Sequence, residues 1–261
     1  VSLTQQEIEQ VRDISRKTWN FFEDHVTKER NWLAPDNVQE DPDHKIAERT
    51  SPTNIGLQML STCSAYDLGF IDPIDLLSKT ERTLQVIKKL ENHHGHLFNW
   101  YDTNTLTPLY PRYISTVDSG NFSGHLLTVK QTLIELRQNP VDFQKSLQST
   151  LDTTTALKRE VNSINSHNKD RLIKKLTNME LKLNEARELD LGRLKDHFKE
   201  ISQKTLDIQQ YTHEKMPEIS HECTRLLKRA VYSTKKKQEN LSKLVPWESE
   251  EIDEITNLIT H

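Results

Sequence analysis

Three polar segments of the sequence carry side chains of the kinds that bind sugars. They read PDNVQEDP together with ERTSPTN, then FNWYDT, and then STVDSGN, and each precedes or separates predicted helices. The planar faces of Trp100 and Tyr101 can stack on the apolar face of a pyranose ring, while aspartate, asparagine and arginine make paired hydrogen bonds with vicinal hydroxyl groups. This mixture of residues predicts a carbohydrate site.

Helix capping is the alternative explanation for the same residues. Hydroxyl and amide side chains just before a helix accept hydrogen bonds from its first N–H groups, Arg49 could pair with a surface carboxylate, and Trp100 could belong to the core. Recurrence favours a site, because a helical toroid lines one mouth with the loops at successive helix entrances. The capping candidates are Ser51, Thr53 and Asn54 in the first segment and Asp118, Ser119 and Asn121 in the third.

Glycoside chemistry requires two carboxyl groups at a defined separation. They lie about 5 Å apart in retaining enzymes and roughly 6.5 to 9.5 Å apart in inverting ones. Spacing along the sequence does not select such a pair, so the catalytic residues stay unassigned. The carboxylates available in the loops are Asp36, Glu40, Asp41, Glu48, Asp102 and Asp118.

The sequence predicts neither a metal site nor a cofactor. His93, His94 and His96 lie close together, but no Glu or Cys stands at a recognised zinc spacing from them, so a solvated loop is favoured. There is no glycine-rich phosphate loop, no G-x-S-x-G elbow and no C-x-x-C pair. Cys63 and Cys223 are predicted to be buried thiols.

Composition excludes some partners. The 261 residues include 35 basic and 39 acidic ones, which are interspersed and give a formal net charge of −4, so no nucleic-acid partner is expected. No apolar run approaches the roughly 18 to 20 residues of a membrane span. A hydrophobic content of 34% with 28% charged residues indicates a helical protein with much solvated surface.

Glycine and aromatic residues divide the sequence into two regions. Of the 17 aromatic residues, 12 lie in the first 125 positions, as do five of the six glycines. Shaped loops are therefore expected only in the first region, and we predict two domains, residues 1–140 and 141–261. In the first, a capping box of Thr4 and Glu7 opens a helix, and short strands are possible within the loop 93–121. The predicted helices of this region span residues 4–26, 53–68, 73 onward, and 119–137.

The second region consists almost entirely of helix-forming residues up to position 245, with turns predicted at 165–168 and at Pro217. Apolar residues in 172–208 fit two heptads displaced by one residue near Gly192, which indicates one long helix with a local irregularity. The stripe could belong to an oligomerising coiled coil or to a helical hairpin that packs on residues 1–140 of the same chain. The hairpin is favoured because the stripe is short and polar residues interrupt it.

Three longer blocks resemble a known family. The succession RKTWNFFEDHVTKERNWLAPDNVQEDP, ERTSPTNIGLQMLSTCSAYDLGFI and GHLFNWYDTNTLTPLYPRYISTVDSGNFSGHLL is similar to the central region of bacterial cyclic β-1,2-glucan synthases. These large inner-membrane proteins have an N-terminal glycosyltransferase, a central glycoamylase-like region and a C-terminal phosphorylase-like domain. The resemblance covers residues 12–127, and the polar helical stretch that follows occupies the place of a variable helical insertion in that family.

The resemblance implies an all-α fold, part of an α/α toroid with a long helical hairpin insertion. It also implies that the segment lines the glucan site used for transglycosylation, the reaction that closes linear β-1,2-glucan into a ring. The segment would lie on the cytoplasmic side of the inner membrane, as part of a membrane-anchored protein. Its partners would be β-1,2-glucan and the remaining domains of the same polypeptide. The family's catalytic acids lie in the following segment, so the isolated chain is expected to be inactive.

The residues that the resemblance places along the glucan are Arg49, Thr50, Ser51, Asn54, Asn99, Trp100, Tyr101, Asp102, Asp118, Ser119 and Asn121. Two other functions stay open from the residues alone. One is a non-catalytic carbohydrate-binding module, because the aromatic residues come without an assignable carboxylate pair. The other is a helical scaffold built on residues 141–245.

Overall fold

A computed structural model describes residues 3–139 and 142–244 and divides them into two compact units. Residues 10–67 and 73–139 form one unit, here called the loop unit. Residues 3–9, 68–72 and 142–244 form the other, the bundle unit. The predicted domain boundary at residues 140 and 141 lies outside the described residues.

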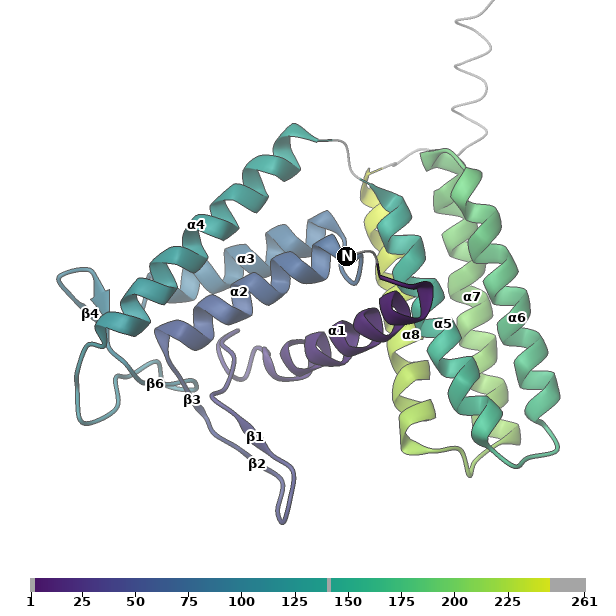
Figure 1. The fold of residues 1–261 in the computed structure, drawn as a ribbon, viewed down its shortest axis with the longest axis horizontal. Coiled ribbons are helices and arrows are strands. Elements are labelled where there is room, and N and C mark those ends of the chain that lie inside the picture. The colour runs from purple at the N-terminus through teal and green to yellow at the C-terminus, as the bar shows by residue number, and fades with distance from the viewer. Residues whose placement is uncertain (1–2, 140–141, 245–261) are drawn as a thin grey trace, which may run out of the picture. The chain divides into compact units, whose positions relative to one another are not determined.

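The loop unit joins helices to six strands of two residues each, paired antiparallel in three small sheets (Figure 1). The strand pairs are β1 with β2, β3 with β6, and β4 with β5. Its elements are α1 (Gln5–His25, in this unit from residue 10), β1 (Val38–Gln39), β2 (Lys45–Ile46), β3 (Arg49–Thr50), α2 (Pro52–Asp67), α3 (Pro73–Ile87), β4 (Asn92–His93), β5 (His96–Leu97), β6 (Tyr101–Asp102) and α4 (Thr116–Gln138).

The sequence predicted most of these elements. The capping box at the start of α1 is present, because the Thr4 N–H donates to Glu7 Oε2 at 2.7 Å and the Glu7 N–H donates to Thr4 Oγ1 at 3.3 Å. Gly69 follows α2 with a φ of 77°, a conformation that glycine adopts readily after a helix. The short strands expected in the loop 93–121 are β5 and β6, with β4 beginning just before it.

Helix α2 is central to the loop unit, since it packs against both α3 and α4. It approaches α4 closely at Gly56, where a Cβ atom would lie 2.1 Å from His125 Nδ1. The apolar core beside it contains Leu33, Ile55, Val86, Leu90, Leu97 and Tyr101.

Gln58 fixes the loop that precedes the β1–β2 hairpin. Its buried side chain accepts a hydrogen bond from the Ala34 N–H at 2.7 Å, and its Nε2 donates to the Trp32 carbonyl oxygen at 2.8 Å and to Thr83 Oγ1 at 2.9 Å. One amide therefore satisfies backbone groups of the loop while bridging α2 to α3, which limits the positions open to the polar segment that follows.

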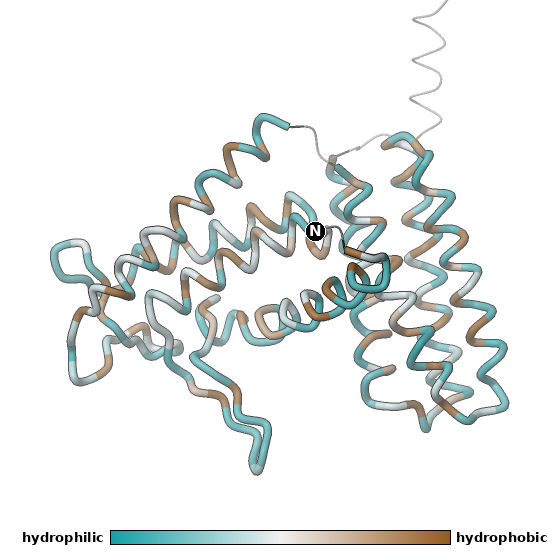
Figure 2. The backbone as a smooth tube through the Cα atoms, in the orientation of Figure 1, coloured by the Kyte–Doolittle hydropathy of each residue, from teal (hydrophilic) through white to brown (hydrophobic). Residues whose placement is uncertain are grey.

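The bundle unit contains four helices, each antiparallel to the next in sequence, and α8 returns beside α5. Figure 2 shows hydrophobic residues recurring along each helix between hydrophilic ones, and the buried ones form a single core that includes Leu147, Leu176, Phe198 and Leu227. The bounds are α5 (Phe143–Ser163), α6 (Lys169–Glu185), the 3-10 turn η1 (Ala186–Glu188), α7 (Leu191–Lys215) and α8 (His221–Leu244).

The prediction of one long helix through residues 172–208 is wrong. The chain reverses between α6 and α7, and His197 Nε2 of α7 lies 2.7 Å from the carbonyl oxygen of Lys182 in α6. Asp190 causes the break, since its side chain caps α7 by accepting a hydrogen bond from the Arg193 N–H at 2.9 Å. The one-residue displacement between the two heptads marked two separate helices. The predicted turns at 165–168 and at Pro217 are confirmed.

The all-α class is confirmed, whereas the closed α/α toroid stays a prediction. None of the helices in residues 3–139 and 142–244 combines the length and apolar character needed to cross a bilayer. Both cysteines are free and buried, as predicted, and burial raises the pKa of each thiol.

A buried lysine stabilises the bundle unit. Lys237 of α8 is 2% exposed, and its Nζ donates to Ser146 Oγ at 2.6 Å and to the Gly69 carbonyl oxygen at 3.0 Å. Ser146 Oγ in turn donates to Asp72 Oδ1 at 2.8 Å, and Asn240 Nδ2 reaches Asp72 Oδ2 at 3.4 Å. The segment 68–72 is therefore held against α5 and α8 by polar contacts that have little access to water.

Replacing this lysine is predicted to destabilise the bundle unit. Lys237→Met keeps the side-chain length but leaves the Asp72 carboxylate buried without its cation, which costs about 3 kcal/mol. Chemical denaturation monitored by circular dichroism measures this loss. Lys235→Met, at an exposed position of the same helix, is the matched control and is expected to change stability by less than about 0.5 kcal/mol. Equal stability of the two variants would contradict the assignment.

A second stability prediction concerns the contact between α2 and α4. Gly56→Ala gains up to about 1 kcal/mol of helix propensity, but the added methyl group overlaps His125 and overpacking costs about 1 to 3 kcal/mol. The net result expected is a loss of about 1 kcal/mol in the free energy of unfolding. In a His125→Ala background only the Cβ atom of residue 125, at 3.1 Å, remains close, so the same substitution should cost less. An unchanged cost there would show that the imidazole ring is not the obstacle.

Candidate functional site

The first polar segment is organised around Asp36. Its Oδ2 accepts hydrogen bonds from Arg49 Nη2 at 2.9 Å and Nε at 3.1 Å, and its Oδ1 accepts one from Asn54 Nδ2 at 3.2 Å. The Asp36 N–H donates to the Arg49 carbonyl oxygen at 2.7 Å. The carboxylate thus fixes the direction of the guanidinium group, while about half of the Arg49 side chain stays exposed.

Pairing of β3 with β6 joins the first segment to the second. Arg49 stands opposite Asp102, and Thr50 stands opposite Tyr101. The Arg49 Cζ atom lies 4.6 Å from the centroid of the Trp100 ring, a distance at which a guanidinium is attracted to an aromatic face. Trp100 and Arg49, which were both predicted as site residues, are therefore in contact.

Asn99 joins the second segment to the third. Oriented by its hydrogen-bond partners, the amide donates from Nδ2 to Asp118 Oδ2 at 3.0 Å, and its oxygen accepts from Tyr113 Oη at 2.7 Å and from Trp100 Nε1 at 2.8 Å. Asn99 is 6% exposed, so these contacts also satisfy a buried amide. The indole ring of Trp100 is thereby held at its face by Arg49 and at its nitrogen by Asn99.

The three segments meet in one connected set of side chains, here called the polar network: Asp36, Arg49, Trp100, Asn99 and Asp118. It contains one guanidinium group, one aromatic ring and one amide, and it ends in a carboxylate on either side. Arg49 is exposed and Trp100, Asp36 and Asp118 are partly buried, so the network combines fixed geometry with access to solvent. Such a surface can stack on a sugar ring and hydrogen-bond its hydroxyl groups.

Other predicted residues build the frame of the network. Tyr101 is fully buried, and its hydroxyl accepts from the Phe98 N–H at 2.7 Å and donates to the Glu91 carbonyl oxygen at 2.5 Å. Thr50 is also fully buried, opposite it in the sheet. Asp102 Oδ1 accepts from the N–H groups of Asn104 at 2.9 Å and Thr105 at 2.8 Å, which closes a tight turn.

A serine of the polar segment caps the helix at both entrances, but only at the first is it one of the predicted capping residues. Ser51 caps α2 by accepting a hydrogen bond from the Asn54 N–H at 3.1 Å. The α4 helix begins at Thr116, earlier than predicted, because Ser115 is its cap and accepts from the Asp118 N–H at 3.1 Å. Asp118 is therefore not a cap, and its carboxylate turns to Asn99 instead. Ser119 Oγ lies 3.3 Å from His96 Nδ1, and Asn121 is exposed.

Comparison with known proteins supports the resemblance. No family model matches the chain. However, 163 residues, 62% of the chain, are 43% identical to the cyclic beta-(1,2)-glucan synthase NdvB of Rhizobium meliloti (strain 1021). The similarity to a cyclic β-1,2-glucan synthase is confirmed. The match spans 6% of the length of that synthase, so it identifies a region of the enzyme and leaves the activity of the whole protein to be proposed.

In this synthase-like segment, sequence reasoning missed several residues that hold the loops together. Arg30 binds Glu48 through two parallel hydrogen bonds of 2.8 Å, and Thr103 Oγ1 reaches the same carboxylate at 3.2 Å. Tyr113 supports Asn99, as described above. Asp36 was recognised as a loop carboxylate but not as the partner of Arg49. Nothing in the local sequence signals such pairs, because the partners lie between 13 and 55 positions apart.

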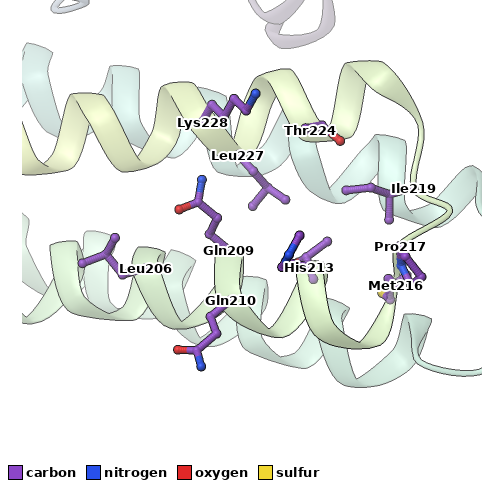
Figure 3. A pocket seen from close by; sticks show the side chains of 11 residues that line it. Leu206, Gln209, Gln210, His213, Met216, Pro217, Ile219, Thr224, Leu227 and Lys228 are labelled. Carbon is purple, nitrogen blue, oxygen red and sulfur yellow. The ribbon is translucent and has the colours of Figure 1, made fainter.

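Two concave surfaces distinguish the units. In the loop unit, a depression of about 440 Å³ is lined by Arg49 and hairpin residues and has mostly polar walls. In the bundle unit, a groove of about 450 Å³ between α7 and α8 is mainly apolar (Figure 3), and Leu227 of α8 points toward Gln209 and His213 of α7 across it. Sugar hydroxyl groups are better matched by the first, which adjoins the polar network through Arg49.

The histidine cluster lies outside the polar network, although His96 contacts Ser119. His93 and His94 contact each other with ring centroids 4.2 Å apart, and both are exposed, as is His96. Across residues 3–139 and 142–244, no group of three or more His, Cys, Asp or Glu side chains is placed to hold a metal ion.

Burial of Tyr101 predicts a decline of stability at high pH. Desolvation raises its pKa to about 12, against about 10 in an unfolded chain. Below pH 10 the tyrosine is protonated in both states and stability is full. Between about pH 10 and 12 only the unfolded chain releases the proton, so stability falls by on the order of 2 kcal/mol.

Denaturation curves from pH 9 to 12 test this assignment. Tyr101→Phe should lower stability at neutral pH through the two lost hydrogen bonds, but it should flatten the decline at high pH. Tyr110→Phe, at a position that is 84% exposed, is the control and should keep the wild-type pH profile. A decline of unchanged steepness in Tyr101→Phe would assign it to other groups.

Proposed function

We propose that this chain is part of the central, ring-closing region of a cyclic β-1,2-glucan synthase, and that its polar network lines the glucan site used for transglycosylation. The observation that carries the proposal is that three separate polar segments are joined through Trp100 and its neighbour Asn99, in a chain of which 163 residues are 43% identical to such a synthase. Helix capping and core packing do not require those segments to meet.

Each group of the network has a distinct task in binding glucan. Arg49 covers one face of the partly exposed indole ring of Trp100, and the other face is the flat apolar surface proposed to stack on a pyranose ring. Arg49 uses Nε and Nη2 to hold Asp36, and the remaining N–H groups of its guanidinium can donate to glucan hydroxyl groups. Asp118 accepts from Asn99 through Oδ2, and its other oxygen can accept from a hydroxyl group.

Catalysis is assigned to the larger polypeptide. The catalytic acids come from the segment that follows in the synthase, whose helices also complete an α/α toroid with those of the loop unit. The bundle unit corresponds to the variable helical insertion. In this proposal the chain binds β-1,2-glucan, acts together with the remaining domains, and lies on the cytoplasmic side of the inner membrane. By itself it does not turn glucan over.

Ring closure by the complete polypeptide that carries this chain tests the proposal. Trp100→Ala removes the stacking surface, and Asp118→Asn removes a charged acceptor while keeping its shape. A hydrogen bond to a charged group is worth about 1.5 to 3 kcal/mol, and a stacked aromatic ring about 0.5 to 1.5 kcal/mol beyond its buried area. Each variant should therefore form cyclic glucan about tenfold more slowly. Chromatography of the products with a fixed supply of linear glucan measures the rate.

The control is Tyr110→Ala, which removes an aromatic ring that is 84% exposed and lies in the same loop. It should cyclise at the wild-type rate. Circular dichroism of all variants separates a lost contact from a lost fold. Wild-type ring closure in both site variants would refute the proposal, and lost glucan binding with normal ring closure would favour a non-catalytic carbohydrate-binding module.

A further inference from the structure

The β1–β2 hairpin carries a polar face that the proposed site does not use. Gln39 and Lys45 are directly opposite in the antiparallel pair, so their side chains project from the same face. Both are exposed, and Figure 1 shows the hairpin extending away from α2 and α3. A hairpin of two residue pairs contributes little to the apolar core, which leaves its polar face available for binding.

This face forms a depression that continues to the polar network. The concave surface of about 440 Å³ runs from Gln39 and Lys45 to Arg49, and Asn37 lies along it. Asn37 Nδ2 donates to Asp36 Oδ2 at 3.1 Å, the same oxygen that holds Arg49. Arg49 therefore belongs to both the hairpin depression and the polar network, and the Asp36 carboxylate hydrogen-bonds to Asn37 of the first and to Arg49 of the second.

The chemistry of the depression suits binding and not bond cleavage. An amide side chain both donates and accepts hydrogen bonds, which matches hydroxyl groups, and the contact of Gln39 Nε2 with the Asp43 carbonyl oxygen at 3.3 Å uses one of its two N–H groups. Lys45 pairs only loosely with Asp43, at 3.8 Å. The carboxylate on this wall, Glu48, is held by two hydrogen bonds from Arg30.

We infer that Gln39 and Lys45 form an outer subsite for the glucan chain, so that the hairpin favours longer linear β-1,2-glucans. The inference rests on the proposed function, since Arg49 connects the subsite to Trp100. Contacts at an outer subsite are the same before and during the reaction, so they lower KM without changing kcat. A glucan too short to extend from Trp100 to the hairpin gains nothing from them.

Steady-state ring closure with linear β-1,2-glucans of graded length tests the subsite in the complete polypeptide. For the double variant Q39A/K45A, KM for long glucans should rise about tenfold, because two hydrogen-bonding groups are lost, while kcat is kept. For the shortest glucans that are turned over, its KM should equal that of the wild type. The control E40A/H44A changes two exposed residues of the same hairpin that do not line the depression, and its KM should be unchanged.

The outcomes separate this inference from the proposed function. If Trp100→Ala impairs ring closure at every glucan length but Q39A/K45A matches the wild type at every length, the outer subsite is refuted and the glucan site stands. If Trp100→Ala also has no effect, the proposed function is refuted, and the subsite that rests on it is refuted with it. An equal rise of KM for E40A/H44A, or a rise that is independent of glucan length, would also overturn the subsite, because it would indicate a general disturbance of the hairpin.

Discussion

The pairing of two residues in β3 with two in β6 is the constraint on which the candidate site depends. A strand pair this short is not stable by itself in water, so neighbouring contacts must hold it in place. The fully buried Tyr101 fixes one side of the pair through its hydroxyl group, and the bidentate contact of Arg30 with Glu48 fixes the chain that leads into β3. Because the pair is fixed, Arg49 and Trp100, which lie 51 positions apart, can contact each other.

Two different solutions to the burial of polar groups occur in this chain. In the loop unit, Gln58 and Asn99 are buried amides whose donors and acceptors are satisfied by loop backbone or by side chains of the site. In the bundle unit, the buried opposite charges of Lys237 and Asp72 hold the segment 68–72 in place. An amide can be buried at lower cost than an ion. Amides thus suit a surface that must also exchange contacts with a ligand, whereas the ionic contact suits a permanent junction.

Local signals were sufficient to predict the helices of the loop unit. The Thr4 capping box, the glycine after α2 and the recurrence of polar residues at helix entrances each reflect interactions within a few positions. Interactions across the fold were not predictable in this way. Nothing in the sequence distinguishes Tyr101, which is buried, from Trp100, which is partly exposed, or connects Asp36 with Arg49. The long helix was mispredicted for a related reason, since the cap supplied by Asp190 was read as an irregularity in a continuous stripe.

Three carboxylates of the polar loops hold other side chains in place. Asp36 accepts hydrogen bonds from a guanidinium and an amide, Glu48 accepts from a second guanidinium, and Asp118 accepts from Asn99. In these contacts each of the three carboxylates is the acceptor. Their hydrogen bonds orient Arg49, Asn99 and the chain that leads into β3, so the carboxylates fix the arrangement of the polar network.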